Sequence, residues 1–135
     1  MIRISPDIGG LDPEILTSSG ASQVVVAQNV VHWSGLVAAR SGPEGISFPA
    51  TDMSGQLSFI LGRLDECLSA AGTDRTRIIM LTMFATTLEG MGAALKTVYA
   101  PWVGEHRPTV TCIGVNSLAF AETLLEVQGC ALLAD

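Results

Sequence analysis

The sequence predicts an α+β, or α/β-like, fold in which one mixed sheet carries two helices on one face. Two amphipathic helical patterns alternate with short apolar, β-branched runs in the order β-β-α-β-α-β-β. The chain of 135 residues suits a single domain, 1–135, that is long enough to bury a core. Because 48% of the residues are hydrophobic and only 15% are charged, the composition excludes disorder and a coiled coil.

The first forty residues predict a lead-in followed by a hairpin. Residues 1–20 contain two prolines and three glycines and are expected to be irregular or extended, with room for one additional strand. Two apolar runs, 23–27 and 30–38, flank the polar pair Gln28-Asn29. Such an arrangement is typical of two antiparallel strands joined by a short turn.

The next segment predicts a loop and then the strongest helix of the chain. Residues 40–53 hold two prolines and two glycines, which are typical of a loop. Asp52 or Ser54 can cap the helix that follows, and Gly72 suits the left-handed residue that ends it. Its apolar side chains recur at helical spacing: Leu57, Ile60, Leu61, Leu64 and Leu68.

The second half of the chain predicts three strands and one further helix. The strands are expected over 78–85, 109–115 and 124–133. A helix begins near Glu89 and places Met91, Leu95, Val98 and Trp102 on one side. Pro101 lacks a backbone N–H, so the helix is expected to kink or stop there. Two helices cover only one face of the sheet, and a second subunit would cover the other face if it is apolar.

The charge and the cysteine content limit the classes of binding partner and the cellular compartment that can be expected. The net charge is −6, and the seven basic residues are scattered, which argues against nucleic acid as a partner. The longest stretch without charge, 15–39, is broken by polar residues, so no membrane span is predicted. Three cysteines, an odd number, indicate free thiols and a cytoplasmic protein. No metal-ligand spacing or cofactor motif occurs, so neither metal nor cofactor is expected.

Two residues in the C-terminal strands are candidates for chemistry. Leu124, Glu126, Gln128 and Cys130 are expected to share one face of the last strand, as Val110, Cys112 and Gly114 share one face of the strand before it. Glu126 is the first candidate, because it lies inside an otherwise apolar segment. A buried carboxyl group tends to have a raised pKa and to suit acid–base catalysis, although Glu126 could instead face solvent at a sheet edge. Cys112 could be a nucleophile if a base lowers its pKa, or simply a small apolar residue.

The two histidines and the other two cysteines carry no clear role. His32 lies in a strand beside Trp33, where it suits either the core or a rim. His106 precedes a strand and is expected in a surface loop. Neither histidine has a partner close in sequence that would assign it a role. Cys67 and Cys130 are expected to serve packing.

Several short strings, in order over about residues 23–133, resemble the RidA (YjgF-like) family. Pro108-Thr109-Val110-Thr111-Cys112 falls on that family's Pro-Ala-Arg-Ser-Cys type motif, and Leu125-Glu126-Val127-Gln128-Gly129 falls on its Ile-Glu-Ile-Glu-Ala end strand. The other matching strings are Trp33-Ser34-Gly35, Gln56 at the start of the first helix, Ala70-Ala71-Gly72, Met83-Phe84 and Val98-Tyr99 through Trp102.

The resemblance implies a chorismate-mutase-like (bacillary type) fold and a homotrimer with a ligand pocket at each subunit boundary. Family members of the best-known kind hydrolyse enamine or imine intermediates, with an arginine that clamps the substrate carboxylate and a glutamate that positions water. Carried over to this chain, the catalytic residue is Glu126, with Cys112 lining the pocket. The substrate-binding residues are then Ser34, Gly35, Thr109, Val110 and Thr111.

The chain departs from the family pattern at the clamp. The family arginine falls on Val110, which has no donor, and Arg107 is three residues away and hence expected on the other strand face. Ala21 and Lys96 replace the usual tyrosine and asparagine. We therefore expect weak 2-imino acid hydrolysis and a less anionic or more hydrophobic substrate. A non-catalytic trimer that binds a metabolite or serves regulation is the alternative.

Overall fold

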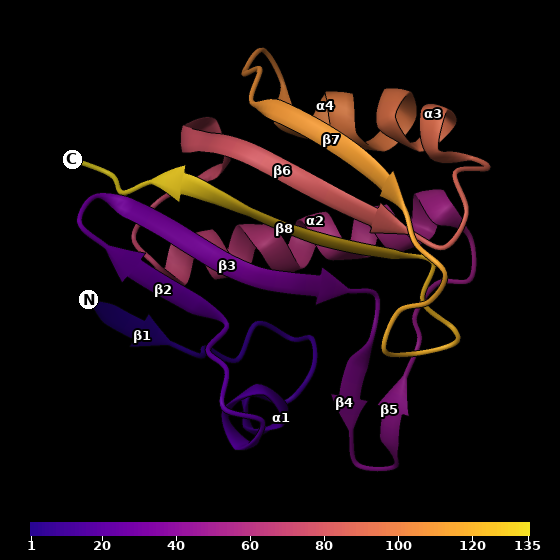
Figure 1. The fold of residues 1–135 in the computed structure, drawn as a ribbon, viewed down its shortest axis with the longest axis horizontal. Helices are drawn as coiled ribbons and strands as arrows, with labels where there is room; N and C mark the ends of the chain where they lie inside the picture. Colours follow the sequence, from indigo (N-terminus) through magenta and orange to yellow (C-terminus); the bar gives the residue numbers. More distant parts are fainter.

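The computed structural model describes residues 1–135 and contains a six-stranded sheet in the order β1-β2-β3-β8-β6-β7 (Figure 1). Only β6 and β7 run parallel, so the sheet is mixed. The strands are β1 (Ile2–Ile4), β2 (Val24–Ala27), β3 (Val30–Val37), β6 (Ile78–Ala85), β7 (Thr109–Gly114) and β8 (Leu125–Leu132). The predicted strands are thus confirmed to within a residue or two, including the additional strand at the N-terminus.

The long helix α2 (Met53–Ala70) crosses one face of the sheet as predicted. The side chain of Asp52 accepts a hydrogen bond from the Gly55 N–H at 2.8 Å and so caps the first turn. Beyond Ala71, Gly72 takes a left-handed conformation with φ +79°, which ends the helix. The predicted apolar stripe, Leu57, Ile60, Leu61, Leu64 and Leu68, is buried against the sheet.

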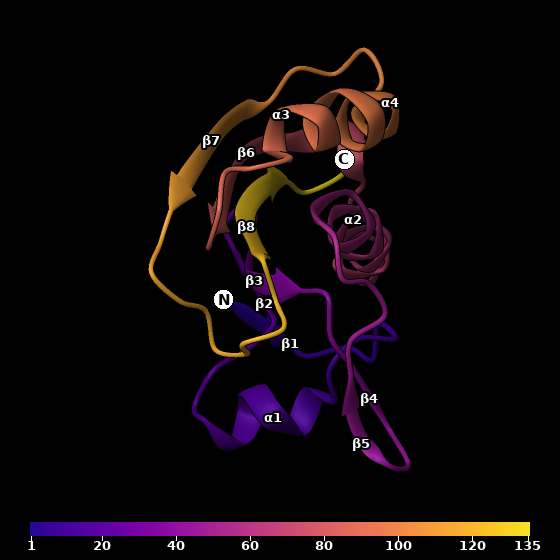
Figure 2. The same ribbon diagram turned by 90° about the vertical axis from the view of Figure 1, so that its right-hand side faces the viewer.

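A second helical stretch on the same face changes its winding before Pro101 instead of ending there. It consists of α3 (Met91–Ala94), the π-helical segment η2 (Leu95–Tyr99) and α4 (Ala100–Val103), in direct succession. Pro101 cannot donate a hydrogen bond and its ring crowds the preceding turn. The wider π turn accommodates both problems, and the helix ends at Val103. Figure 2 shows α2, α3 and α4 on one side of the sheet.

One cluster of polar groups ties the second helical stretch to α2. Asp65 of α2 forms an ion pair of 2.5 Å with Arg75, which follows in the 3-10 turn η1 (Arg75–Arg77). The Arg75 guanidinium lies 4.8 Å from the ring centre of Trp102, and the Trp102 indole N–H donates to Asp65 at 3.0 Å. These contacts fix α4 against α2 and thereby position the residues around it.

Two short elements replace segments that the sequence predicts as irregular. The lead-in forms α1 (Pro13–Ser18), whose first turn is capped by Asp12 accepting from the Glu14 N–H at 2.9 Å. The predicted loop contains a two-stranded hairpin of β4 (Arg40–Gly42) and β5 (Gly45–Ser47). These elements are too short to show an apolar period, and the Asp-Pro start of α1 is the only local signal that the sequence offers.

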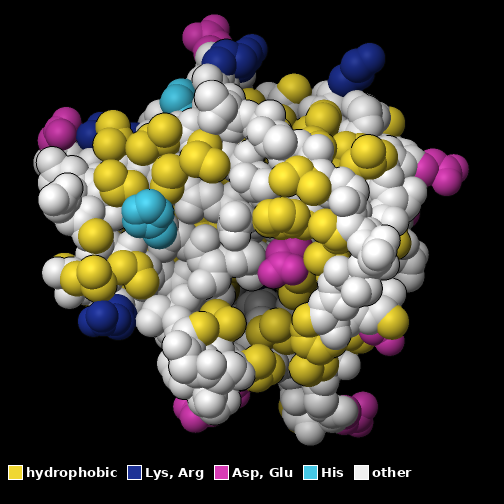
Figure 3. Space-filling view, in the orientation of Figure 1, with side chains coloured by type: hydrophobic (Ala, Val, Ile, Leu, Met, Phe, Trp, Pro, Cys, Tyr) yellow, Lys and Arg dark blue, Asp and Glu magenta, His cyan; other side chains and the backbone are white.

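The two faces of the sheet differ in what covers them. On the helix side, 26 buried residues form one core. On the opposite face, large apolar side chains remain exposed, among them Met80, Ile113 and Leu132 at 40–44%. Figure 3 shows apolar side chains gathered across this open face, around an acidic group. The uncovered face expected from the element order is therefore present and apolar. None of the helices combines the length and apolarity that a membrane crossing requires.

Candidate functional site

Glu126 of β8 points to the open face of the sheet and lies among apolar side chains. Strand register places it opposite Val37 of β3 and Phe84 of β6, and Phe84 is in turn opposite Ile113 of β7. No hydrogen bond or ion pair within the chain reaches its half-buried carboxyl group. Burial raises the pKa of Glu126 above its usual value, because the charged form loses water without gaining a partner.

Gly35 of β3 makes room for this carboxyl group. The register between β3 and β8 shifts between Trp33 and Leu36, so the backbone bulges at Ser34-Gly35. A β-carbon built on Gly35 would overlap the Glu126 carboxyl group. The Glu126 side chain therefore lies directly over the Gly35 backbone, and any side chain at position 35 would displace it.

Ser34 lies beside this pair, but its hydroxyl is engaged by the chain. Its Oγ donates to the Ser22 carbonyl at 2.7 Å, and its backbone N–H donates to the Gln23 carbonyl at 2.8 Å. The Gln23 amide donates back to the Ser34 carbonyl at 3.1 Å. Ser34 thus fixes the bulge and can offer a ligand only its lone pairs.

The candidate residues of β7 divide between the two faces of the sheet. Val110 is opposite buried Leu81, and Cys112 is opposite buried Met83, so both point toward the helices. Burial raises the pKa of the Cys112 thiol, and no base contacts it. Within one chain, Val110 and Cys112 are therefore separated by the sheet from Glu126.

The threonines of β7 lie on the same face as Glu126. Thr111 is opposite Thr82 of β6, which is opposite Gln128 of β8. Thr109 is opposite Met80 and is exposed. The predicted alternation of side chains between the two faces is correct within β7. It is also correct for Glu126, Gln128 and Cys130 of β8, which share the open face. Leu124, which is expected on that face, precedes β8 and packs against the core instead.

Arg107 does not lie where strand parity predicts. It precedes β7, which begins at Thr109, so the alternation of a strand does not apply to it. Its side chain lines a pocket with Tyr99 and Val103, on the side of the sheet toward which Val110 points. The expectation that Arg107 and Val110 lie on different faces is therefore wrong.

The histidines are placed differently from one another. His32 is exposed on the open face, opposite Cys130. His106 Nε2 lies 2.6 Å from the Ile78 carbonyl oxygen, which anchors the segment between α4 and β7 to the start of β6. No group of three or more His, Cys, Asp or Glu side chains is arranged to hold a metal ion.

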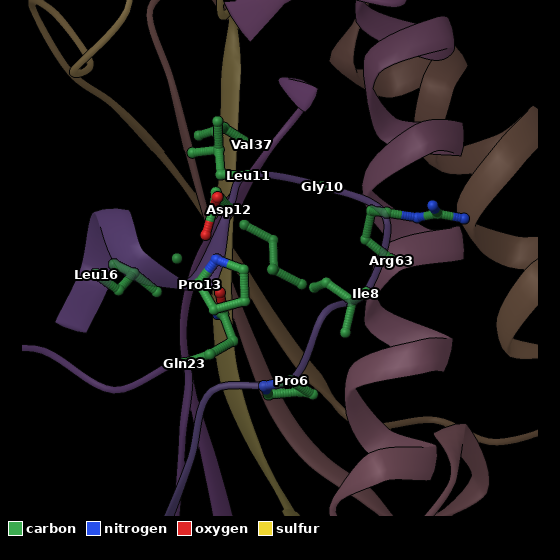
Figure 4. A pocket seen from close by; sticks show the side chains of 12 residues that line it. Pro6, Ile8, Gly10, Leu11, Asp12, Pro13, Leu16, Gln23, Val37 and Arg63 are labelled. Atoms are coloured by element: carbon green, nitrogen blue, oxygen red, sulfur yellow. The ribbon is translucent and has the colours of Figure 1, made fainter. Parts of the chain in front are cut away.

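A pocket of about 50 Å³ opens between the N-terminal segment and the end of β3 (Figure 4). Gly35 and Val37 line it, so it adjoins the strand positions that contact Glu126. Gln23 and Asp12 contribute polar groups, whereas the guanidinium of Arg63 turns away from the other lining residues. Neither Asp12 nor Gln23 could be recognised as a lining residue from the sequence, because only the folded arrangement of the N-terminal segment against β3 brings them together.

The comparisons with known proteins agree on one family. The family model described as Endoribonuclease L-PSP matches residues 14–133. Among solved structures, RidA from the Antarctic bacterium Psychrobacter sp. has a TM-score of 0.82 at 19% identity, over 98% of this chain and 100% of that chain. A Mycobacterium tuberculosis member of the YjgF/YER057c/UK114 family has a TM-score of 0.79 at 19% identity, over 98% of each chain. No curated protein matches the chain significantly.

Proposed function

The chain belongs to the RidA/YjgF/L-PSP family, and we propose that it hydrolyses, deaminates or tautomerises an unsaturated, conjugated small molecule of the enamine or imine type. The family generally consists of enamine and imine deaminases. The observation that carries the proposal is Glu126, a half-buried carboxyl group with a raised pKa, an apolar setting and no partner in the chain. A carboxyl group in such a setting suits general acid–base catalysis.

Glu126 is proposed to move the protons of the hydrolysis. Its carboxylate accepts a proton from water as the water oxygen bonds to the carbon of the protonated imine and the electron pair of the C=N double bond moves to nitrogen, which gives a neutral carbinolamine. The same proton then passes to nitrogen as the carbon–nitrogen bond breaks. The hydroxyl oxygen forms the carbonyl double bond, its proton leaves with the ammonia as ammonium, and the Glu126 carboxylate is restored. Because burial raises its pKa, the Glu126 carboxylate accepts a proton more readily than an exposed glutamate does, which favours its use as a proton carrier.

A homotrimer is proposed to complete the site. Within one chain the sheet separates Val110 and Cys112 from Glu126, Ser34 and Gly35. Strand β7 is the edge of the sheet, so its helix-side residues can meet Glu126 of another copy but not their own. The exposed apolar side chains of the open face support such an assembly, which is typical of the family.

The substrate is proposed to be less anionic or more hydrophobic than a 2-imino acid. By the family resemblance, Val110 occupies the place of the arginine that clamps the substrate carboxylate, and valine cannot donate a hydrogen bond. Thr109, Thr111, Ser34 and Gly35 would then orient the ligand by hydroxyl and backbone groups. If the pocket binds without turnover, the protein is the metabolite-binding or regulatory trimer that remains the alternative.

Charge argues against transferring the endoribonuclease activity in the family model's description to this chain. RNA binding needs several cations on one face. The net charge is −6, and the closest basic pair, Arg75 and Arg77, is engaged by Asp65, by the Leu133 carbonyl and by Asp135.

The test compares two imine classes and two variants. Imines generated by an amine oxidase, which lack a carboxylate, should decay faster with the protein than 2-imino acids generated by an amino-acid oxidase, as measured by semicarbazide trapping. Glu126→Gln should lower the rate about 100-fold or more, whereas Gln128→Ala, two residues along the same face, should retain it. Full activity in Glu126→Gln would contradict the role of this residue. Tight binding without turnover of either class would favour the non-catalytic alternative.

A further inference from the structure

A second pocket, of about 150 Å³, lies between α4 and the segment that leads into β7. Its lining residues are Tyr99, Ala100, Val103, His106, Arg107 and Pro108. It includes neither Glu126 nor any other residue of the proposed catalytic site. Its polar groups are a phenol, an imidazole and a guanidinium, and no acidic side chain lines it.

Tyr99 lines this pocket and carries an unused hydrogen-bond donor. The residue is 9% exposed, and its hydroxyl is buried with no hydrogen-bond partner. Leaving such a group unpaired is costly, so native proteins rarely do so without a ligand or water to serve it. The ring is held against Trp102, with ring centres 6.1 Å apart, and the polar cluster around Asp65 fixes Trp102 in turn.

Arg107 brings a positive charge and unpaired N–H groups to the same pocket. Its Nη1 donates to the carbonyl groups of Gly104 and His106, which fixes the guanidinium. Its Nε and Nη2 donate to no group of the chain. The charge of Arg107 lowers the pKa of Tyr99 against the larger effect of burial, which indicates that the two groups lie near each other.

The backbone around Tyr99 also departs from regular geometry. The π-helical segment Leu95–Tyr99 ends at this residue. Such segments are rare in proteins and occur frequently at functional sites, because the wider turn redirects the side chains that follow it. The imidazole of His106 is held in place by its contact with the Ile78 carbonyl oxygen.

We propose that this pocket binds the oxyanion group of a small molecule, a carboxylate or a phosphate. The two free nitrogens of Arg107 match two oxygen atoms of either group in a forked arrangement. The Tyr99 hydroxyl is buried in the chain alone, so binding must shift the pocket lining enough for this hydroxyl to donate to the same group and gain the partner that it lacks. The site is distinct from the proposed catalytic pocket, and binding there does not require turnover.

The test uses inorganic phosphate and acetate as separate probes. Tyr99 is the only tyrosine of the chain, so ring resonances of protein labelled at tyrosine report on this pocket alone. Either probe, or both, should shift these resonances saturably, and the better one identifies the oxyanion class. By calorimetry, Arg107→Gln should weaken binding about tenfold or more, and Tyr99→Phe about fivefold.

Arg40→Gln is the matched control, because it removes one positive charge from an exposed residue outside this pocket. It should leave the affinity unchanged if the pocket, and not overall charge, holds the anion. Circular dichroism checks that each variant is folded. The proposal is overturned if neither probe shifts the tyrosine resonances saturably, or if Arg107→Gln and Arg40→Gln weaken binding equally.

Discussion

The two faces of the sheet are built from the same strands, but side chains are buried on one face and remain exposed or unpaired on the other. On the face toward the helices, apolar side chains of α2 and the strands bury one another, and Leu57, Leu64 and Met83 are fully buried. On the open face, Met80 and Leu132 stay exposed and Glu126 has no partner. The folded core thus lies on one face of the sheet, and the other face is the one on which we propose the assembly and the chemistry.

The largest effect should come from placing a charge on the open face. Met80→Asp puts a carboxylate on a face that is proposed to be buried between copies, so the trimer should fall to monomers by light scattering. The fold should persist by circular dichroism, because Met80 is 41% exposed within one chain. Ser58→Asp adds the same charge on an exposed position of α2 and should leave the trimer intact. Monomers in the unaltered protein would contradict the proposed assembly.

A truncation on the covered face should act on stability instead. Leu64→Ala removes a fully buried side chain of α2 and should lower the free energy of unfolding by about 2–5 kcal/mol. Urea denaturation measures this loss. Leu132→Ala on the open face, where the residue is 44% exposed, should cost much less in a monomeric background such as Met80→Asp. Equal losses at the two positions would remove the distinction between the faces.

Gly35→Ala should disturb the site without adding any chemistry. A β-carbon there would overlap the Glu126 carboxyl group, so the carboxyl group must move. We expect turnover to fall about tenfold or more, since small displacements of a catalytic group are costly. Gly62→Ala in α2, where a β-carbon meets nothing, should leave turnover unchanged. Unaltered turnover in Gly35→Ala would show that the carboxyl position over Gly35 is not the active one.

The smallest expected effect is a change in folding stability with pH that arises from the Glu126 carboxyl group, which has no partner in the chain. Because the pKa of Glu126 is raised in the folded chain, the folded state holds its proton more tightly than the unfolded state does. Its contribution to stability is therefore highest at low pH and declines as pH rises from the ordinary glutamate pKa through the raised one. Glu126→Gln, measured in the Met80→Asp background, should become more stable relative to its parent as pH rises above the ordinary glutamate pKa of about 4.3. A constant difference in melting temperature would contradict the raised pKa.

Most strands and both major helices could be predicted from the sequence, because each spans enough residues to show its period. The short α1 and the β4–β5 hairpin could not, since neither buries enough apolar side chains to leave a pattern. For the site, alternation within β7 was predictable, but its alignment with β8 was not. Register is set by pairing between distant segments, so the separation of Cys112 from Glu126 emerges only in three dimensions.

The π-helical segment before Tyr99 makes the direction of one side chain depend on a count of residues. Each residue of a regular helix turns its neighbour by about 100°. A π turn holds about one residue more than an α turn, so regular winding of the same sequence would rotate one flank of the helix relative to the other by about that angle. With α4 held to α2 through Trp102, such a rotation would take Met91 out of its buried position. Deleting Thr97 removes the additional residue, so a structure of that variant should show regular winding with Met91 and Trp102 still in place.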